Sequence, residues 1–315
     1  MKISICIPVL NEELSLESFY KEIATVAKEL PSYEFEFVFS DNNSNDKSWE
    51  TLTELGRHDS RIKAIQFSRN IGFDQSILFN YSTATGDAFI QIDCDLQDDP
   101  AVIKNFVNEW ELGAKVVYGL RNERNENFIV KILRNLGYEI IRILSESKIT
   151  PRVGNFCLID REVRDILMLR KSQISYLRGA IFELNFQSVK IPYTRRKRVS
   201  GESKFNFIKV VGLGIDAIIN HSLKPLRLAT IIGLFFLFLS FISIIYYIGL
   251  KFFDTDLPRG LASIHILILI NIAFNSMFLG IIGEYLLRLV KNLRPLPSPR
   301  IVKVINLDYL KNGDI

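Results

Sequence analysis

Two long stretches without a charged residue constrain the fold of this chain most. Residues 228–250 and 260–283 contain no Asp, Glu, Lys or Arg, and each is longer than the about 20 apolar residues that cross a bilayer core as a helix. Helices buried inside globular domains seldom run so long without a charge. The sequence therefore predicts a hairpin of two transmembrane helices.

The basic residues around these stretches predict the orientation of the hairpin. Lys224 and Arg227 precede the first stretch, and Arg288 and Lys291 follow the second, whereas residues 251–259 hold two basic and two acidic residues. By the positive-inside rule, both termini lie in the cytoplasm. The first residues also lack the pattern of a secretory signal, so we expect an integral membrane protein whose N-terminal domain is cytoplasmic.

The first 200 residues have the alternation of short apolar runs and helical periodicity that is typical of a soluble α/β domain. This rhythm predicts a mostly parallel sheet with helices on both faces and a ligand site at the carboxyl ends of the strands. The predicted strands are 3–7, 35–39, 62–67 and 88–92, and the predicted helices between them are 16–30, 48–55 and 75–83.

The pattern divides the chain into four parts. Residues 1–204 form the α/β domain. Residues 205–225 form an interfacial amphipathic helix, and the alternative interpretation of this segment is a surface helix of the α/β domain. Residues 226–290 hold the two transmembrane helices. Residues 291–315 form a cytoplasmic tail with a short strand at 300–305, after three prolines that forbid a helix.

Composition excludes several kinds of site and partner. Cys6, Cys94 and Cys157 lie far apart, and neither a CxxC pair nor a Cys/His cluster is present, which excludes a zinc site by spacing. The net charge of +4 is small, and the basic run 195–198 lies beside two membrane spans. Phosphate groups of a substrate or of anionic lipid are therefore better partners for this run than nucleic acid.

A burst of carboxylates follows the fourth predicted strand, in the segment 93–99. Like charges this close repel one another unless a cation neutralises them. Oxygen ligands without histidine or thiolate favour Mg²⁺ or Mn²⁺, which bind through one or two carboxylates together with substrate phosphates. The alternative is an acidic helix start in which Asp98 caps the helix after Pro100.

Several motifs resemble those of one enzyme family. They resemble the inverting family 2 glycosyltransferases of GT-A fold, with a Rossmann-like catalytic domain, and more narrowly the polyprenyl-phosphate glycosyltransferases. The general motifs are Ile7-Pro8-Val9-Leu10-Asn11-Glu12-Glu13, Asp41 to Asp46, Ser68-Arg69-Asn70-Ile71-Gly72, Thr85-Gly86-Asp87 and Asp93 to Asp98, and the narrower ones are Val117 to Arg121, Arg178-Gly179, Gly201-Glu202-Ser203-Lys204 and Lys224 to Arg227.

The resemblance implies roles for individual residues. It implies a nucleotide-sugar pocket at Pro8, Leu10, Glu12, Asp41 and Asp93, a metal and diphosphate site at Asp93, Asp95 and Gln97, and catalytic roles for Asp93, Asp95 and Asn155. Around the acceptor phosphate we place Arg121, Arg124, Lys131, Arg134, Ser203 and Lys204, with a solvated helix face as the alternative for Arg124 and Arg134. The implied cofactor is Mg²⁺ or Mn²⁺.

The implied partners are a nucleotide diphosphate sugar, polyprenyl (undecaprenyl) phosphate and the lipid bilayer, in a bacterial inner or plasma membrane. The resemblance also implies a homo-oligomer, a tetramer. The expected reaction transfers a hexose, such as glucose from UDP-glucose, with inversion. The sugar itself stays open between glucose, mannose, an N-acetylhexosamine and an amino-pentose.

The chain departs from the family pattern at Gly154-Asn155-Phe156, where the family has an aspartate that is proposed as catalytic base. Asn155 cannot take a proton. A phosphate monoester has a second pKa of about 6, so a phosphate acceptor is already dianionic and needs no base. We therefore expect Asn155 to position a substrate. Leu10, Asn42 and Arg134 also depart from the usual residues.

Two other functions compete with this one. The first is a membrane glycosyltransferase that acts directly on a hydroxyl of a lipid-linked glycan or builds a polymer, although Trp49 and Trp110 lie in no Gln-x-x-Arg-Trp motif. The second is an inactive scaffold, which only Asn155 favours.

Overall fold

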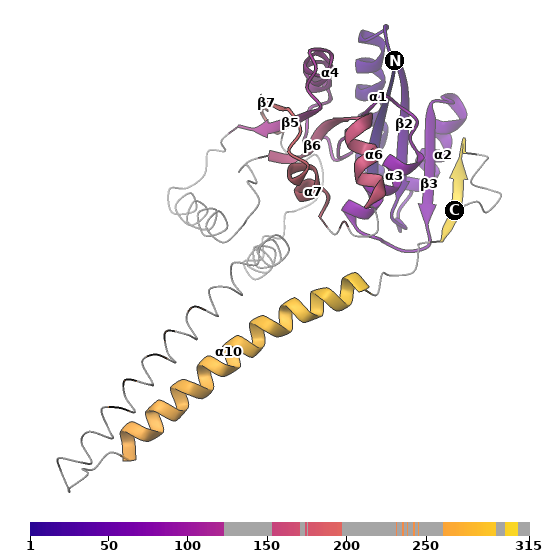
Figure 1. Cartoon of the computed structure of the whole chain (residues 1–315). Helices are drawn as coiled ribbons and strands as arrows, with labels where there is room; N and C mark the ends of the chain where they lie inside the picture. Colours follow the sequence, from indigo (N-terminus) through magenta and orange to yellow (C-terminus); the bar gives the residue numbers. More distant parts are fainter. Residues whose placement is uncertain are drawn as a thin grey trace, which may run out of the picture. The chain divides into compact units, whose positions relative to one another are not determined.

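The structure is a computed structural model that describes residues 1–122, 153–170, 174, 176–196, 261–293 and 300–307, with the isolated positions 231, 235, 238, 242 and 245. The chain divides into two units (Figure 1). One unit comprises Met1–Lys131, Ile149–Phe205 and Leu296–Ile315, and the other comprises Ile132–Lys148 and Asn206–Pro295. Each unit is described by itself.

The first unit is built on one mixed sheet of eight strands, in the order β7-β5-β6-β4-β1-β2-β3-β8. β1 pairs in parallel with β2 and β4, β2 with β3, and β5 with β7, whereas β4–β6, β5–β6 and β3–β8 are antiparallel. The strands are β1 (Lys2–Val9), β2 (Glu34–Asp41), β3 (Ile62–Phe67), β4 (Ala88–Gln91), β5 (Val116–Arg121), β6 (Val153–Asp160), β7 (Ser188–Tyr193) and β8 (Ile301–Ile305).

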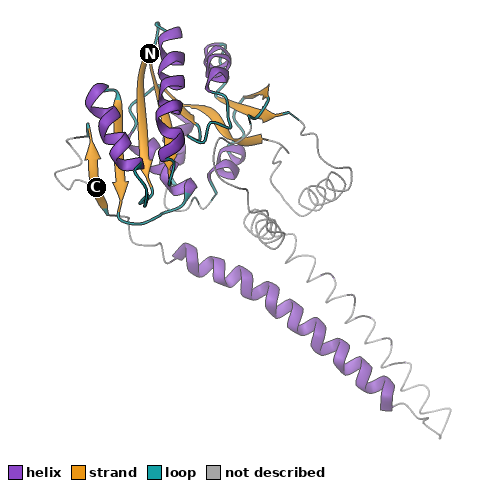
Figure 2. Cartoon of the chain, turned by 180° about the vertical axis from the view of Figure 1, so that it is seen from behind, coloured by secondary structure: helices purple, strands orange, loops and turns teal. Residues whose placement is uncertain are grey.

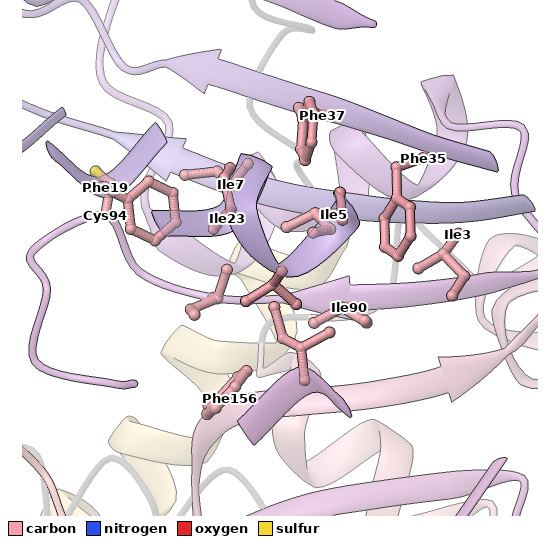
Figure 3. Packing of buried hydrophobic residues seen from close by; sticks show 14 of the residues in the cluster. Ile3, Ile5, Ile7, Phe19, Ile23, Phe35, Phe37, Ile90, Cys94 and Phe156 are labelled. Atoms are coloured by element: carbon pink, nitrogen blue, oxygen red, sulfur yellow. The ribbon is translucent and has the colours of Figure 1, made fainter. Parts of the chain in front are cut away.

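Helices cover both faces of this sheet, as predicted (Figure 2). On one face Ile3, Ile5 and Ile7 of β1 belong to one buried cluster with Phe19 and Ile23, whose side chains are shown in Figure 3. The helices that contribute to this face are α1 (Glu13–Glu29), α2 (Ser48–His58) and α4 (Ile103–Glu111), the last preceded by the short helix η1 (Pro100–Val102). The other face is covered by α3 (Phe73–Thr83), α6 (Arg161–Leu169) and α7 (Leu177–Glu183).

The C-terminal strand belongs to the sheet. β8 pairs antiparallel with β3, with Ala64 opposite Ile305, and so returns the end of the chain to the first unit. The second predicted helix, 48–55, is too short, because α2 continues through Gly56 to His58. A Cβ at Gly56 would lie 2.5 Å from Cγ2 of Ile305, so glycine there lets β8 approach α2.

The second unit contains α10 (Leu261–Leu293), a helix of 33 residues that includes the second predicted transmembrane segment. Within the described ranges, no helix is long and apolar enough to cross a membrane. The predicted interfacial helix at 205–225 lies outside the described residues, as does most of the first predicted transmembrane segment at 228–250.

A buried carboxylate ties the amino-terminal ends of three strands together. Glu36 is 2% exposed and accepts hydrogen bonds from Ser4 Oγ at 2.6 Å, Thr85 N at 2.6 Å and Lys63 Nζ at 2.5 Å, with Lys2 Nζ at 2.8 Å. Burial alone would raise the pKa of Glu36, but these donors outweigh it and lower the pKa from 4.5 to about 2. The folded state therefore prefers the charged carboxylate.

Glu36→Gln is expected to lower the free energy of unfolding of this unit by about 3 kcal/mol at pH 7, because it leaves buried donors without their charged partner. The folded pKa lies below the unfolded value, so this stabilisation is present above pH 4.5 and is lost as the pH falls toward 2. Wild type and variant should converge over that range. Unfolding is measured by the fluorescence of Trp49 and Trp110, which both belong to this unit. The control is Glu34→Gln, because the Glu34 side chain is exposed. An equal loss of stability at pH 2.5 and pH 7 would contradict the assignment.

Candidate active site

The predicted site residues gather at one edge of the sheet. β1, β2 and β4 are parallel and end there, and β6 begins there because it runs antiparallel to β4. The turns after the strands are bonded to one another: Asn42 N donates to the Val9 carbonyl at 2.9 Å, and Cys94 Sγ donates to the Pro8 carbonyl at 3.6 Å. This edge is where ligands bind in open α/β sheets.

The first two turns form one connected wall of this edge. Leu10 is 42% exposed, and Asn11 adopts a left-handed backbone with φ 57°. Asn11 N donates to Ser44 Oγ at 2.9 Å, and Glu12 N donates to Ser48 Oγ at 2.9 Å. These bonds hold the segment that contains Leu10 and Glu12 against the segment after β2.

Asp41 lies beneath this wall and is fully buried. One carboxylate oxygen accepts from Ser44 Oγ at 2.5 Å, and the other accepts from Gln66 Nε2 at 2.7 Å. Both oxygens are thus engaged within the protein. Asp41 therefore holds the segment after β2 in place.

The acidic segment after β4 carries the predicted metal ligands. Asp95 Oδ1 accepts from Gln97 N at 3.0 Å, and Leu96 between them has φ 58°, which is uncommon for a residue other than glycine. Burial and then the charges of Asp98 and Asp95 raise the pKa of Asp93 to about 7, although Arg195 and Arg121 oppose the shift. This segment is therefore a region of negative potential that attracts a cation.

Asp98 does not cap the following helix, which corrects one sequence-based alternative. That cap is Asp99, whose Oδ1 accepts from Ala101 N at 2.9 Å. The Asp98 carboxylate is fully buried and accepts from Tyr193 OH at 2.6 Å. Its Oδ1 lies 3.2 Å from Arg195 Nε, and its Oδ2 lies 3.7 Å from an Arg121 terminal nitrogen.

Sequence reasoning missed this cluster of Asp98, Tyr193, Arg121 and Arg195, which we call the Asp98 cluster. Only Arg121 had been placed in the site, and Arg195 had been counted with a basic loop. The available signal was Asp98 itself, a carboxylate at the end of a buried strand that needs a partner when it is buried. Arg121 lies on another strand, and Tyr193 and Arg195 are about a hundred residues away in sequence, so no local pattern reveals these partners.

The start of β6 supports this cluster. The Arg121 guanidinium lies against Gly154, where a Cβ would be 2.7 Å from the terminal nitrogen. Phe156 meets the Tyr193 ring edge to face, with centroids 5.6 Å apart. Side chains alternate along a strand, so half-buried Asn155 lies on the opposite face from Gly154 and Phe156.

Asp160, the carboxylate nearest to Asn155 in the sequence, has a structural role. It ends β6 and caps α6, because its Oδ1 accepts from Glu162 N at 3.0 Å. Its Oδ2 accepts from Trp110 Nε1 at 2.8 Å. The other predicted acceptor residues, Arg124, Lys131, Arg134, Ser203 and Lys204, lie outside the described residues.

In a mixed α/β sheet, carboxylates and arginines at the carboxyl edge are suited to binding phosphate-bearing ligands. The chain belongs to glycosyl transferase family 2, whose model matches residues 4–167. The expectation of a family 2 glycosyltransferase is therefore confirmed.

Curated relatives match over nearly the whole chain. The SfII prophage-derived bactoprenol glucosyl transferase of Shigella flexneri is 32% identical over 96% of this chain and 98% of its own length. A glycosyltransferase of Bacillus subtilis, YkcC, is also 32% identical, over 93% of this chain and 91% of its own. Among solved structures, glucosyl-3-phosphoglycerate synthase of Mycobacterium tuberculosis, with Mn²⁺, UDP and phosphoglyceric acid, aligns with a TM-score of 0.48 at 15% identity, over 69% of this chain and 76% of that one.

Proposed function

We propose that this glycosyltransferase moves a hexose from a nucleotide diphosphate sugar, such as glucose from UDP-glucose, onto polyprenyl (undecaprenyl) phosphate, with inversion at the sugar carbon. The observation that carries the proposal is the meeting of an acidic segment with Arg121 and Arg195 at one edge of the sheet. Relatives named bactoprenol glucosyl transferases, which match along the whole chain, support a polyprenyl acceptor.

We propose Mg²⁺ or Mn²⁺ as the cofactor, held by Asp93, Asp95 and Gln97. Burial and then the charges of Asp98 and Asp95 raise the pKa of Asp93, and a bound cation would offset both effects. Among the described residues, no three His, Cys, Asp or Glu side chains are arranged to hold a metal ion. The substrate diphosphate would supply the remaining oxygens, as is usual for Mg²⁺. The bound ion would neutralise charge on the leaving diphosphate.

The side chains of this chain have two tasks in the reaction. The wall of Leu10, Glu12 and the segment after β2 holds the nucleotide, and the arginines bind phosphate oxygens through charge-assisted hydrogen bonds. The acceptor phosphate attacks the sugar carbon from the face opposite the nucleotide. We place Arg124, Lys131, Arg134, Ser203 and Lys204 beside Arg121 around that acceptor.

Asn155→Asp is expected to change kcat by less than about tenfold. A dianionic phosphate needs no base, and the strand alternation places residue 155 away from Gly154 and Arg121. Initial rates from pH 5 to 8 measure the effect, and wild type and variant should both lose activity below about pH 6, the second pKa of the phosphate. Asn155→Ala is the control for side-chain removal.

A gain of about 100-fold or more on Asn155→Asp, with a new acidic limb, would instead indicate general base catalysis. That result would favour a sugar hydroxyl as the acceptor.

The transfer itself is tested with purified protein, undecaprenyl phosphate and a panel of radiolabelled nucleotide sugars with Mg²⁺ or Mn²⁺. Label that moves into the lipid extract supports the proposed reaction and names the sugar. Label that appears only in a lipid-linked glycan supports the hydroxyl acceptor. Absence of transfer to either acceptor supports an inactive scaffold.

We further propose that the protein is an integral, homotetrameric membrane protein with its catalytic domain in the cytoplasm. The two uncharged stretches and their flanking basic residues support this proposal. A cysteine introduced at Thr255 should react with an impermeant thiol reagent in intact cells, whereas Cys6, Cys94 and Cys157 are buried and give a low background. Labelling of an N-terminal cysteine instead would reverse the orientation. Light scattering in detergent measures the number of subunits.

A further inference from the structure

We propose that Asp98 is a positioning residue that fixes Arg121 and Arg195 as a pair of phosphate-binding arginines, and that Arg195 is a substrate-binding residue. The inference rests on the proposed function, because it assigns these residues to the phosphate groups of that reaction. It separates Asp98 from the neighbouring metal ligands: its carboxylate serves the arginines.

The first observation is that the protein's own groups already engage the Asp98 carboxylate. It has no exposed surface, Tyr193 OH donates to Oδ1 at 2.6 Å, and Arg195 Nε lies 3.2 Å from the same oxygen. Arg121 approaches the other oxygen at 3.7 Å and also donates from Nε to Tyr193 OH at 3.3 Å. Oδ2 itself has no hydrogen-bond partner among the described residues, so Asp98 is joined to the two guanidinium groups by charge and to Tyr193 by a hydrogen bond, and this arrangement orients the arginines.

The second observation is that a backbone hydrogen bond holds the segment after β7, which contains Arg195, against the acidic segment after β4. Arg196 N donates to the Gln97 carbonyl at 2.8 Å, and the Arg196 guanidinium pairs with Asp99 at 2.9 Å and with Glu22 at 2.8 Å. Asn122 N also donates to the Tyr193 carbonyl at 2.9 Å. The ends of β5 and β7 and the segment after β4 therefore form one fixed frame.

The third observation is that the paired arginines keep donors for a ligand. One Asp98 carboxylate faces two guanidinium groups, so Asp98 by itself does not neutralise the pair. The side chains of Arg121 and Arg195 are 31% and 21% exposed, and both act electrostatically on Asp93. Each guanidinium has five N–H donors, more than these contacts use. An anion with several oxygens, a phosphate, is the matching ligand.

The phosphate could belong to the donor diphosphate or to the acceptor lipid. The experiment compares Asp98→Asn, Arg195→Gln and Arg195→Lys in the full chain in detergent. Arg61→Gln is the matched control, because Arg61 pairs with Asp59 at the start of β3, away from the carboxyl ends of the parallel strands. The readouts are UDP binding by calorimetry, Mn²⁺ affinity, and KM for the nucleotide sugar and for undecaprenyl phosphate.

We expect Arg195→Gln to weaken one phosphate ligand by about 30-fold, since it removes charge-assisted hydrogen bonds, and Arg195→Lys to recover part of this loss. Weaker UDP binding identifies the donor diphosphate, and a higher KM for undecaprenyl phosphate alone identifies the acceptor. Asp98→Asn should reproduce the Arg195→Gln defect, with Mn²⁺ affinity within about threefold of wild type. Arg61→Gln should match wild type.

Two results would overturn the proposal. One is unchanged UDP binding and unchanged KM values in Arg195→Gln; the other is a loss of Mn²⁺ affinity in Asp98→Asn that parallels its loss of activity. If Asp98→Asn does not fold, Tyr193→Phe, which removes only the hydroxyl donor, replaces it. A wild type that binds UDP but transfers no sugar would refute the proposed function, and the UDP arm would still test Arg195.

Discussion

Asp95→Asn is expected to lower kcat about a thousandfold, which corresponds to about 4 kcal/mol of transition-state stabilisation. The substitution keeps the size of the side chain and keeps an oxygen that can accept the Gln97 N–H bond, so the fold of the acidic segment should persist. It removes one of the negative charges that raise the pKa of Asp93. The segment then attracts a divalent cation more weakly, and charge on the leaving diphosphate is less well neutralised.

The measurement is the initial rate of lipid glycosylation as a function of Mg²⁺ and Mn²⁺ concentration, with and without a chelator. Wild type should lose its activity in the chelator, and Asp95→Asn should need a much higher metal concentration for any residual rate. Asp165→Asn is the control, because Asp165 is exposed and pairs only with neighbouring Arg164 in the described part of the chain. An Asp95→Asn variant that keeps wild-type activity in the chelator would remove Asp95 from the metal site.

The sequence predicted those parts of the fold that local patterns encode. The strand at 62–67 has the predicted position, and the predicted helix 75–83 lies within α3, because an apolar run between polar residues and helical periodicity are local signals. The predicted carboxyl edge also brings together the segments after β1, β2 and β4. β6, however, was noticed only for the Gly154-Asn155-Phe156 motif and was not predicted as a strand.

The rest could not be predicted because it depends on contacts between distant segments. The prediction of a mostly parallel sheet did not foresee the antiparallel pairs, in which β6 joins β4 and β5 and β8 joins β3. Asp98 was interpreted as a helix cap because capping is a local pattern, whereas its real partners come from β5, from the end of β7 and from the segment after β7. Gly154, which makes room for the Arg121 side chain of β5, has no local signature either.

Gly154→Ala is expected to lower kcat/KM for undecaprenyl phosphate about 100-fold while leaving the protein folded, because displacement of a binding group by about 1 Å is sufficient for such a loss. A Cβ at residue 154 would lie 2.7 to 2.8 Å from three atoms of the Arg121 guanidinium. The far end of an arginine can move aside at a cost in stability below about 1 kcal/mol. It would then leave its place beside Asp98 and, in the proposed site, beside the acceptor phosphate.

Gly86→Ala provides the contrasting case. Its Cβ would lie 2.8 Å from the Ser4 backbone nitrogen and 2.9 Å from the Ala88 carbonyl, and backbone atoms in the sheet cannot move aside. That variant should lose stability, and any loss of activity should follow the loss of folded protein.

A double-mutant cycle with Arg121→Ala separates displacement of the arginine from other effects of the new methyl group. If Gly154 acts through Arg121, Gly154→Ala should have no further effect in the Arg121→Ala background, and the coupling should equal nearly the whole effect of the single substitution. Additive losses would show instead that the methyl group acts on another part of the site, such as the neighbouring Asn155. Because Gly154 and Asn155 lie on opposite faces of β6, we expect the coupling to Arg121 to dominate.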